Sequence, residues 1–82
     1  MKRITWTEQA RSDVRALERP TAMRILSALD RFARTGVGDV RTLQGDREEL
    51  RLRIGDYRLF FVATGDDAIE VRRVRHRREA YR

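Results

Sequence analysis

The sequence predicts a small α+β domain, in which a two-helix hairpin packs on a twisted, mainly antiparallel sheet of four strands. The length of 82 residues suits a single domain (1–82) with a modest core. Two stretches with helical spacing of apolar residues precede three short apolar runs in the last third of the chain. Glycine and aspartate separate those runs, as expected at hairpin turns. The predicted order is β-α-α-β-β-β.

A strand followed by a helix is predicted at the N-terminus. Residues 3–6 alternate between polar and apolar side chains, which is typical of a half-buried strand. Thr7 is a favourable N-cap, because its hydroxyl can accept a hydrogen bond from an unpaired backbone N–H of the first helical turn. Apolar residues then recur at helical spacing, at Ala10, Val14 and Leu17. We expect this helix to end near Arg19.

A second helix is predicted from Pro20, which suits a first helical position because its missing N–H would be unpaired there. Its apolar residues form a wide face: Ala22, Ile25, Leu26, Leu29, Phe32 and Ala33. Gly36 is expected to end it, because glycine tolerates the left-handed conformation common after a helix. The short link predicts an antiparallel helical hairpin whose apolar side covers the sheet.

The next segment, residues 36–46, is predicted to be a loop by its glycines and aspartates, with Val40 and Leu43 in contact with the core. Three strands are expected after it, at Leu50–Ile54, Tyr57–Thr64 and Ala68–Val74. Gly55-Asp56 and Gly65-Asp66-Asp67 separate them, so that the three strands form a meander.

The side-chain pattern of each strand predicts what covers it. The first alternates cleanly, with its leucines and isoleucine on one face and Arg51 and Arg53 on the other. The second is apolar nearly throughout, which predicts a central strand covered on both faces, and Arg58 is its one charge. In the last, Ile69 and Val71 are expected on one face and Val74 on the other.

The composition excludes several classes of protein. The chain has no cysteine and one histidine, so we expect neither a disulfide framework nor a metal centre, and no cofactor. Its apolar runs are far shorter than the roughly 20 residues needed to span a bilayer, and the N-terminus lacks the apolar core of a signal peptide. We therefore expect a cytoplasmic protein that does not bind membranes.

The net charge of +6 favours a polyanionic partner, and its distribution indicates where that partner binds. Residues 72–82 hold six arginines and one acid. Antiparallel strands should bring Arg51 and Arg53 close to Arg58, and the chain end should return beside them with Arg77 and Tyr81. Such an exposed basic floor suits the phosphates of a nucleic acid. Arginines alternating along a strand are also typical of a merely solvated face, and this alternative stays open.

The chain resembles the RelE/ParE superfamily of toxins from type II toxin–antitoxin systems. The resemblance covers essentially the full length, and two segments carry it: LRLRIGDYRLFFV (Leu50 to Val62) and IEVRRVRHRREAYR (Ile69 to Arg82). Within them, "G-D-Y-R" enters a strand and "H-R-R-E-x-Y" follows the last one. The RelE-like branch is favoured, because gyrase-directed ParE relatives usually lack a terminal pairing such as Arg77 with Tyr81.

This resemblance implies a ribosome-dependent mRNA endoribonuclease that uses neither metal nor cofactor and employs the RNA 2′-hydroxyl as nucleophile. Tyr81 would act as general base, Arg58 would stabilise charge on the phosphorane, and Arg77 would stabilise the leaving 5′-oxygen. RNA-binding positions are then expected at four further arginines of the two segments: Arg51, Arg53, Arg75 and Arg78. His76 is an alternative acid or base, because histidine ordinarily titrates near neutrality.

The resemblance also implies partners. These are a cognate antitoxin, expected to be acidic because the chain is basic, in a toxin–antitoxin hetero-oligomer, together with the ribosome and mRNA. Two rival functions remain at this point. One is a ParE-like inhibitor of DNA gyrase, and the other is a catalytically inactive module that binds only antitoxin or nucleic acid.

Overall fold

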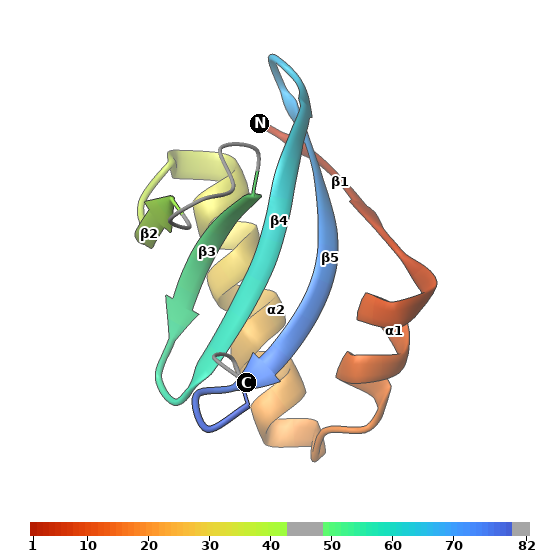
Figure 1. Cartoon of the computed structure of the whole chain (residues 1–82). Helices are drawn as coiled ribbons and strands as arrows, with labels where there is room; N and C mark the ends of the chain where they lie inside the picture. Colours follow the sequence, from red (N-terminus) through yellow and green to blue (C-terminus); the bar gives the residue numbers. More distant parts are fainter. Residues whose placement is uncertain (43–48, 80–82) are drawn as a thin grey trace.

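The structure is a computed structural model that describes residues 1–42 and 49–79 (Figure 1). Its elements, in chain order, are β1 (Arg3–Trp6), α1 (Glu8–Arg15), α2 (Arg19–Thr35), β2 (Asp39–Thr42), β3 (Glu49–Ile54), β4 (Tyr57–Gly65) and β5 (Ala68–His76). α2 crosses behind the sheet, and α1 lies beside the lower end of β5 (Figure 1). The predicted α+β class with a helical hairpin on a mainly antiparallel sheet is confirmed. No helix of this part of the chain is long and apolar enough to cross a membrane.

The sheet of the described residues has five strands in the order β1-β5-β4-β3-β2, one more than predicted. β1 runs parallel to β5, and the other neighbours are antiparallel. The additional strand is β2, in a segment expected to be a loop, where Val40 pairs with Leu52. Its pairing is non-local, and a four-residue polar segment gives no periodic signal for it. The predicted contact of Val40 with the core is confirmed, whereas Leu43 lies outside the described residues.

Residues close in sequence to the helix ends determine where α1 begins and where α2 ends. The Thr7 hydroxyl accepts a hydrogen bond from the Ala10 N–H at 3.1 Å, as an N-cap should. α1 ends at Arg15 rather than near Arg19, because residues 16–18 already form the turn into α2. At the far end of α2, Gly36 adopts a left-handed φ of 76° and donates its N–H to the Phe32 carbonyl, which confirms the predicted stop.

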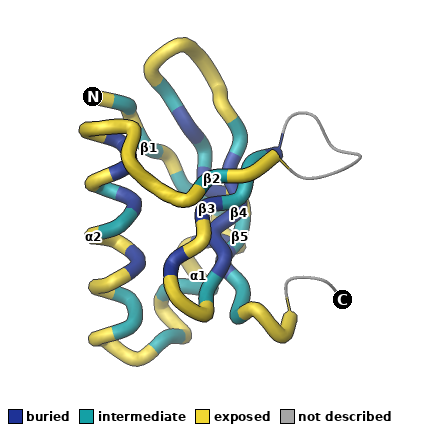
Figure 2. Tube along the Cα trace, turned by 90° about the vertical axis from the view of Figure 1, so that its left-hand side faces the viewer, coloured by how far each residue is buried: buried dark blue, intermediate teal, exposed yellow. Residues whose placement is uncertain are grey.

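The core lies between α2 and the inner face of the sheet, and Figure 2 shows buried residues on both. Phe32 of α2 packs on Phe61 of β4 with ring centroids 5.4 Å apart. Val74 also belongs to this core, and its predicted position on the opposite face was wrong. The cause is a bulge: Phe60 pairs with Arg73 but Phe61 pairs with Val71, which leaves Arg72 as an extra residue and shifts the alternation.

The outer face of β4 is covered by side chains of the sheet itself rather than by a second layer. Phe60 is only 1% exposed. The guanidinium carbon of Arg73 lies 4.0 Å from its ring centroid, and that guanidinium pairs with the buried Glu49 carboxylate at 2.9 and 3.3 Å. The sequence predicted that β4 is covered on both faces. On the outer face this holds at Phe60, where the cover is the stacked Arg73 guanidinium.

Candidate functional site

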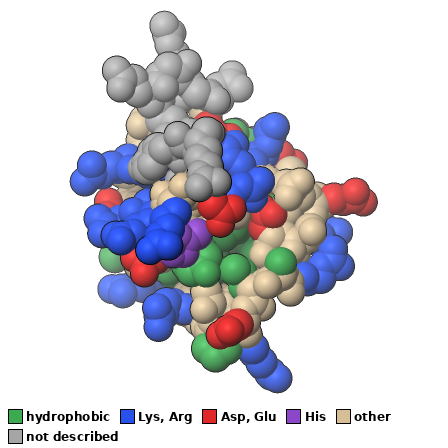
Figure 3. Space-filling model, turned by 60° about the horizontal axis from the view of Figure 1, so that its bottom comes forward, with side chains coloured by type: hydrophobic (Ala, Val, Ile, Leu, Met, Phe, Trp, Pro, Cys, Tyr) green, Lys and Arg blue, Asp and Glu red, His purple; other side chains and the backbone are tan. Residues whose placement is uncertain are grey.

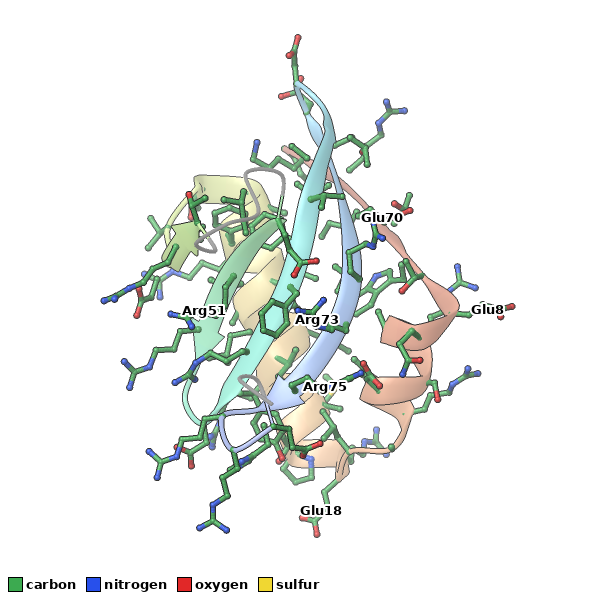
Figure 4. The ribbon with its side chains drawn as sticks, in the orientation of Figure 1. Glu8, Glu18, Arg51, Glu70, Arg73 and Arg75 are labelled. Carbon is green, nitrogen blue, oxygen red and sulfur yellow. The ribbon has the colours of Figure 1, made fainter. Side chains whose placement is uncertain are left out.

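The strand register gathers arginines on the outer face of the sheet (Figure 4). Arg58 of β4 pairs across the sheet with Arg53 of β3 on one side and with Arg75 of β5 on the other. In the next row, Arg51 and Arg73 flank Phe60. The structure thus brings together the arginines that the sequence pattern placed on one face. We call Arg51, Arg53, Arg58 and Arg77 the arginine cluster.

Arg58 lies at the centre of this cluster and is buried, not part of an exposed floor as predicted. Only 8% of it is exposed. Its Nη1 donates to the carbonyl oxygens of Gly55 and Tyr57, at 2.9 Å each, so the guanidinium is held against the β3–β4 turn. Gly55 makes that turn possible with a φ of 58°. The Arg58 Nε is buried and has no hydrogen-bond partner among the described residues.

The burial of Arg58 also affects its pKa. Loss of hydration lowers the pKa of Arg58 below its ordinary value, and the charges of Arg53, Arg51 and Arg77 lower it further. Asp56 partly offsets them. Because an arginine guanidinium stays protonated in proteins, its positive charge is retained at a cost in stability. An anion placed beside Arg58 would relieve that repulsion and satisfy the free Nε–H.

Arg77 reaches the cluster through the turn that follows β5. Its backbone N–H donates to the Asp56 carbonyl at 2.6 Å, and its exposed side chain lies 3.8 Å from the Asp56 carboxylate. The turn is closed by the Glu79 N–H, which donates to the His76 carbonyl at 2.8 Å. This places Arg77 beside the β3–β4 turn and within electrostatic reach of Arg58.

His76 is half-buried at the end of β5. Its ring meets Tyr57 edge to face, with centroids 5.3 Å apart. Its Nδ1 accepts a hydrogen bond from the Arg78 N–H at 3.2 Å. Because Nδ1 accepts in this arrangement, the neutral ring carries its hydrogen on Nε2, which is then a hydrogen-bond donor.

Two carboxylates in this region were not singled out in the sequence. Asp13, on the polar side of α1, pairs with the Arg75 guanidinium and accepts from the Val74 N–H at 2.9 Å. Asp13 therefore accepts from a backbone N–H of β5 at a position beyond Val71, the last residue of β5 that pairs with β1. Glu49 holds Arg73 in the same way. Arg75, predicted to bind RNA, is thus already paired, and nothing local in the sequence indicates a contact between α1 and a strand about 60 residues away.

The other residues predicted to belong to the site are Arg53, Arg78 and Tyr81. The side chains of Arg53 and Arg78 are exposed. Tyr81 lies outside the described residues, so its position relative to the arginine cluster stays a prediction. Among residues 1–42 and 49–79, no group of three or more His, Asp or Glu side chains is placed to hold a metal ion.

Comparisons with known proteins find similarity to toxins of toxin–antitoxin systems. A family model described as the ParE toxin of the type II toxin–antitoxin system parDE matches residues 4–81. The RelE–RelB complex of Pyrococcus horikoshii contains a similar chain, with 24% identity, a TM-score of 0.76, and coverage of 96% of this chain and 98% of that one. The RelBE2 toxin–antitoxin complex of Mycobacterium tuberculosis gives 25% identity, a TM-score of 0.64, and coverage of 92% and 96%.

Isolated toxins share the fold as well. The RelE toxin of E. coli is similar at 15% identity with a TM-score of 0.75, covering 93% of this chain and 84% of that chain. No curated protein sequence matches.

Proposed function

We propose that this chain, which belongs to the ParE toxin family of type II toxin–antitoxin systems, is the toxin of its module and cleaves mRNA on the ribosome. The family match confirms the superfamily that the "G-D-Y-R" and "H-R-R-E-x-Y" motifs predicted. The RelE-like branch is supported by the similarity to solved RelE chains. The proposal of mRNA cleavage is supported by the charges gathered around Arg58.

The observation that carries this proposal is Arg58. It is a buried cation with an unused Nε–H, surrounded by Arg53, Arg51 and Arg77. The positive charges of this grouping repel one another, and the grouping suits a phosphate, whose oxygens accept from several guanidinium groups together. A phosphodiester approaching the outer face would meet exposed Arg53 first, and its contact with the buried Nε–H of Arg58 requires the side chains over that atom to move aside.

The chemistry we propose is transesterification within the RNA. The 2′-oxygen attacks the adjacent phosphorus, its proton passes to a base, and the bond to the 5′-oxygen breaks. Arg58 and Arg53 stabilise the charge that develops on the phosphorane, and Arg77 stabilises the leaving 5′-oxygen. Tyr81 is the proposed base, which requires the cluster to favour its phenolate, since a free tyrosine has a pKa of about 10. His76 is the alternative base, and this role requires the ring to give up the hydrogen bond that its Nδ1 accepts from the Arg78 N–H.

An antitoxin is the proposed protein partner. RelE chains of this fold are solved in complexes with RelB antitoxins. The net charge of +6 and the arginine cluster predict an acidic antitoxin segment.

The test is a cell-free translation reaction dosed with the protein, in which mRNA 5′ ends are mapped. Wild type is compared with Tyr81→Phe and Arg77→Ala. Arg34→Ala serves as the matched control, because it removes the same charge from α2, where the exposed Arg34 side chain pairs with Asp30 one helical turn away. We expect cuts within translated codons for the wild type and the control, and none for the other two variants.

Intact mRNA with undiminished translation would overturn this proposal. The family model is one of ParE toxins, so a gyrase supercoiling assay is then the appropriate second experiment. Inhibition of gyrase that survives Tyr81→Phe and Arg77→Ala would establish the rival function. A protein inactive in both assays would be a binding module.

A further inference from the structure

Arg75 occupies a strand position from which it should join the arginine cluster, yet its guanidinium is held elsewhere. In β5 it pairs directly across the sheet with Arg58 of β4. Residues paired in this way have their side chains on one face of the sheet, with Cβ atoms about 5 Å apart. Beyond the loss of hydration, however, the charges that lower the pKa of Arg58 come from the rest of the arginine cluster. The charge of Arg75 therefore acts at a different place.

That place is the side of β5 that faces α1 (Figure 4). The Arg75 Nη1 donates to the Asp13 carboxylate of α1 and, at 2.9 Å, to the Val74 carbonyl. Only 29% of the Arg75 side chain and 13% of the Asp13 side chain are exposed. One nitrogen thus serves two acceptors, and the guanidinium is fixed against the edge of its own strand.

The position of Asp13 is explained by this contact rather than by the stability of its own helix. Asp13 lies in the last turn of α1, where the helix dipole disfavours a negative charge. Its Oδ2 also accepts from the Val74 N–H at 2.9 Å, and its Oδ1 accepts from Gln9 Nε2 at 2.8 Å. Because both oxygens are engaged, the carboxylate is held in place beside Arg75.

A carboxylate and a phosphate bind a guanidinium in the same way, so the two compete for it. Figure 3 views the molecule toward its lower end, where Lys and Arg side chains gather beside the histidine and acidic side chains lie close to them. Asp13 is the acid that takes up the arginine directly opposite Arg58. It therefore occupies a guanidinium that could otherwise bind the phosphate.

We propose that Asp13 is a positioning residue that holds Arg75 out of the phosphate site; this rests on the proposed function and specifies how that site is limited. An RNA phosphate is then bound from the β3 side, by Arg53 and the rest of the arginine cluster. Loss of the Asp13 charge releases Arg75 toward Arg58 and adds a phosphate contact. RNA affinity therefore rises, whereas loss of a merely supporting ion pair would leave it unchanged or lower it.

The experiment measures RNA binding by Asp13→Asn in the full chain. The side-chain oxygen of asparagine can still accept from the Val74 N–H, so the substitution removes the charge and keeps the backbone contact. Fluorescence anisotropy with a labelled single-stranded RNA, methylated at its 2′-oxygens so that it cannot be cut, is followed over a range of salt concentrations. We expect a Kd about threefold lower at low salt. The slope of log K against log salt concentration should be steeper by about 0.7, the contribution of one added phosphate contact.

Two variants show whether the effect passes through Arg75. Asp30→Asn is the matched control, because it removes the same charge from an acid that pairs with an arginine on α2, and its slope should equal that of the wild type. The double variant Asp13→Asn/Arg75→Met should also return to the wild-type slope, because the arginine that makes the added contact is gone. In NMR spectra, RNA should shift the Arg75 Nε–H signal in Asp13→Asn and leave it in place in the wild type.

Equal slopes for Asp13→Asn and Asp30→Asn, beside a wild type that binds RNA, would overturn this inference and leave the proposed function standing. An Arg75 signal that moves when RNA binds to the wild type would also overturn it, and that measurement needs no variant to fold. A wild type without affinity for RNA would overturn the proposed function, and this inference with it.

Discussion

The two faces of the central strand β4 bury their side chains in different ways. On the inner face, Leu59 and Phe61 pack against apolar residues of α2 and the neighbouring strands. On the outer face, Phe60 is buried beneath the Arg73 guanidinium, and Arg58 is buried among other arginines. The inner face stabilises the fold, whereas the outer face gathers like charges at a cost in stability. Changes on the two faces should therefore separate stability from activity.

The largest expected effect on stability is on the inner face. Phe61→Ala should lower the free energy of unfolding by about 3–5 kcal/mol, because it removes a fully buried ring that packs on Phe32. Urea denaturation measures this loss. Val37→Ala, at an exposed apolar residue, should change stability by less than about 0.5 kcal/mol. Equal losses for both variants would contradict the assignment of the core.

A smaller loss is expected where β2 approaches the inner face. A Cβ on Gly38 would lie 2.8 Å from Leu52 Cδ1 and 3.4 Å from Phe32 Cδ1, so Gly38→Ala should cost about 1–3 kcal/mol. Gly65→Ala is the matched control, because its Cβ would meet only Ala68 at an ordinary 3.8 Å. Thermal unfolding of the two variants checks this. A Gly38→Ala protein as stable as the control would show that β2 is not held against the core.

On the outer face, we expect a substitution that abolishes activity to leave the stability of the fold nearly unchanged. Arg58→Met removes repulsion from three arginines but also two hydrogen bonds to turn carbonyls, so stability should stay within about 1 kcal/mol of wild type or rise. Cleavage in the translation assay should be lost, while Arg34→Met should retain it. A strongly destabilised Arg58→Met would make Arg58 a structural residue. Normal cleavage would place the phosphate site elsewhere.

The smallest effect concerns the salt dependence of RNA binding. Each phosphate contact to single-stranded RNA contributes about 0.7 to the slope of log K against log salt concentration, so Arg53→Ala should reduce that slope by about this amount. Fluorescence anisotropy with a labelled RNA measures it. Arg34→Ala should leave the slope unchanged. An identical slope for wild type and Arg53→Ala would exclude Arg53 from contact with phosphate.

Residues that act locally were predictable from the sequence. Thr7 caps its own helix, Gly36 ends the next one, and Gly55-Asp56 forms a two-residue turn, because each depends on side chains within a few positions. The alternation of Arg51 and Arg53 placed both on the outer face for the same reason.

What the sequence could not show depends on distant pairing. The bulge at Arg72, the contact of Asp13 with Arg75 and the pairing of β2 with β3 arise only when separate segments meet. The burial of Arg58 is a related case: its arginine neighbours were predicted, but an isolated charge in an apolar strand gives no sign that its guanidinium will be held against the β3–β4 turn.

The most direct test of the central claim, that Arg58 is built to hold an RNA phosphate, is the NMR signal of its Nε–H, identified by its absence in Arg58→Met. The protein is titrated with a short RNA whose 2′-hydroxyl is replaced by hydrogen at the cleavage position, so that it binds without reacting. If Arg58 holds a phosphate, this signal should shift and its proton should exchange more slowly with water. An Arg58 signal that stays unchanged while the other arginine signals move would contradict that claim.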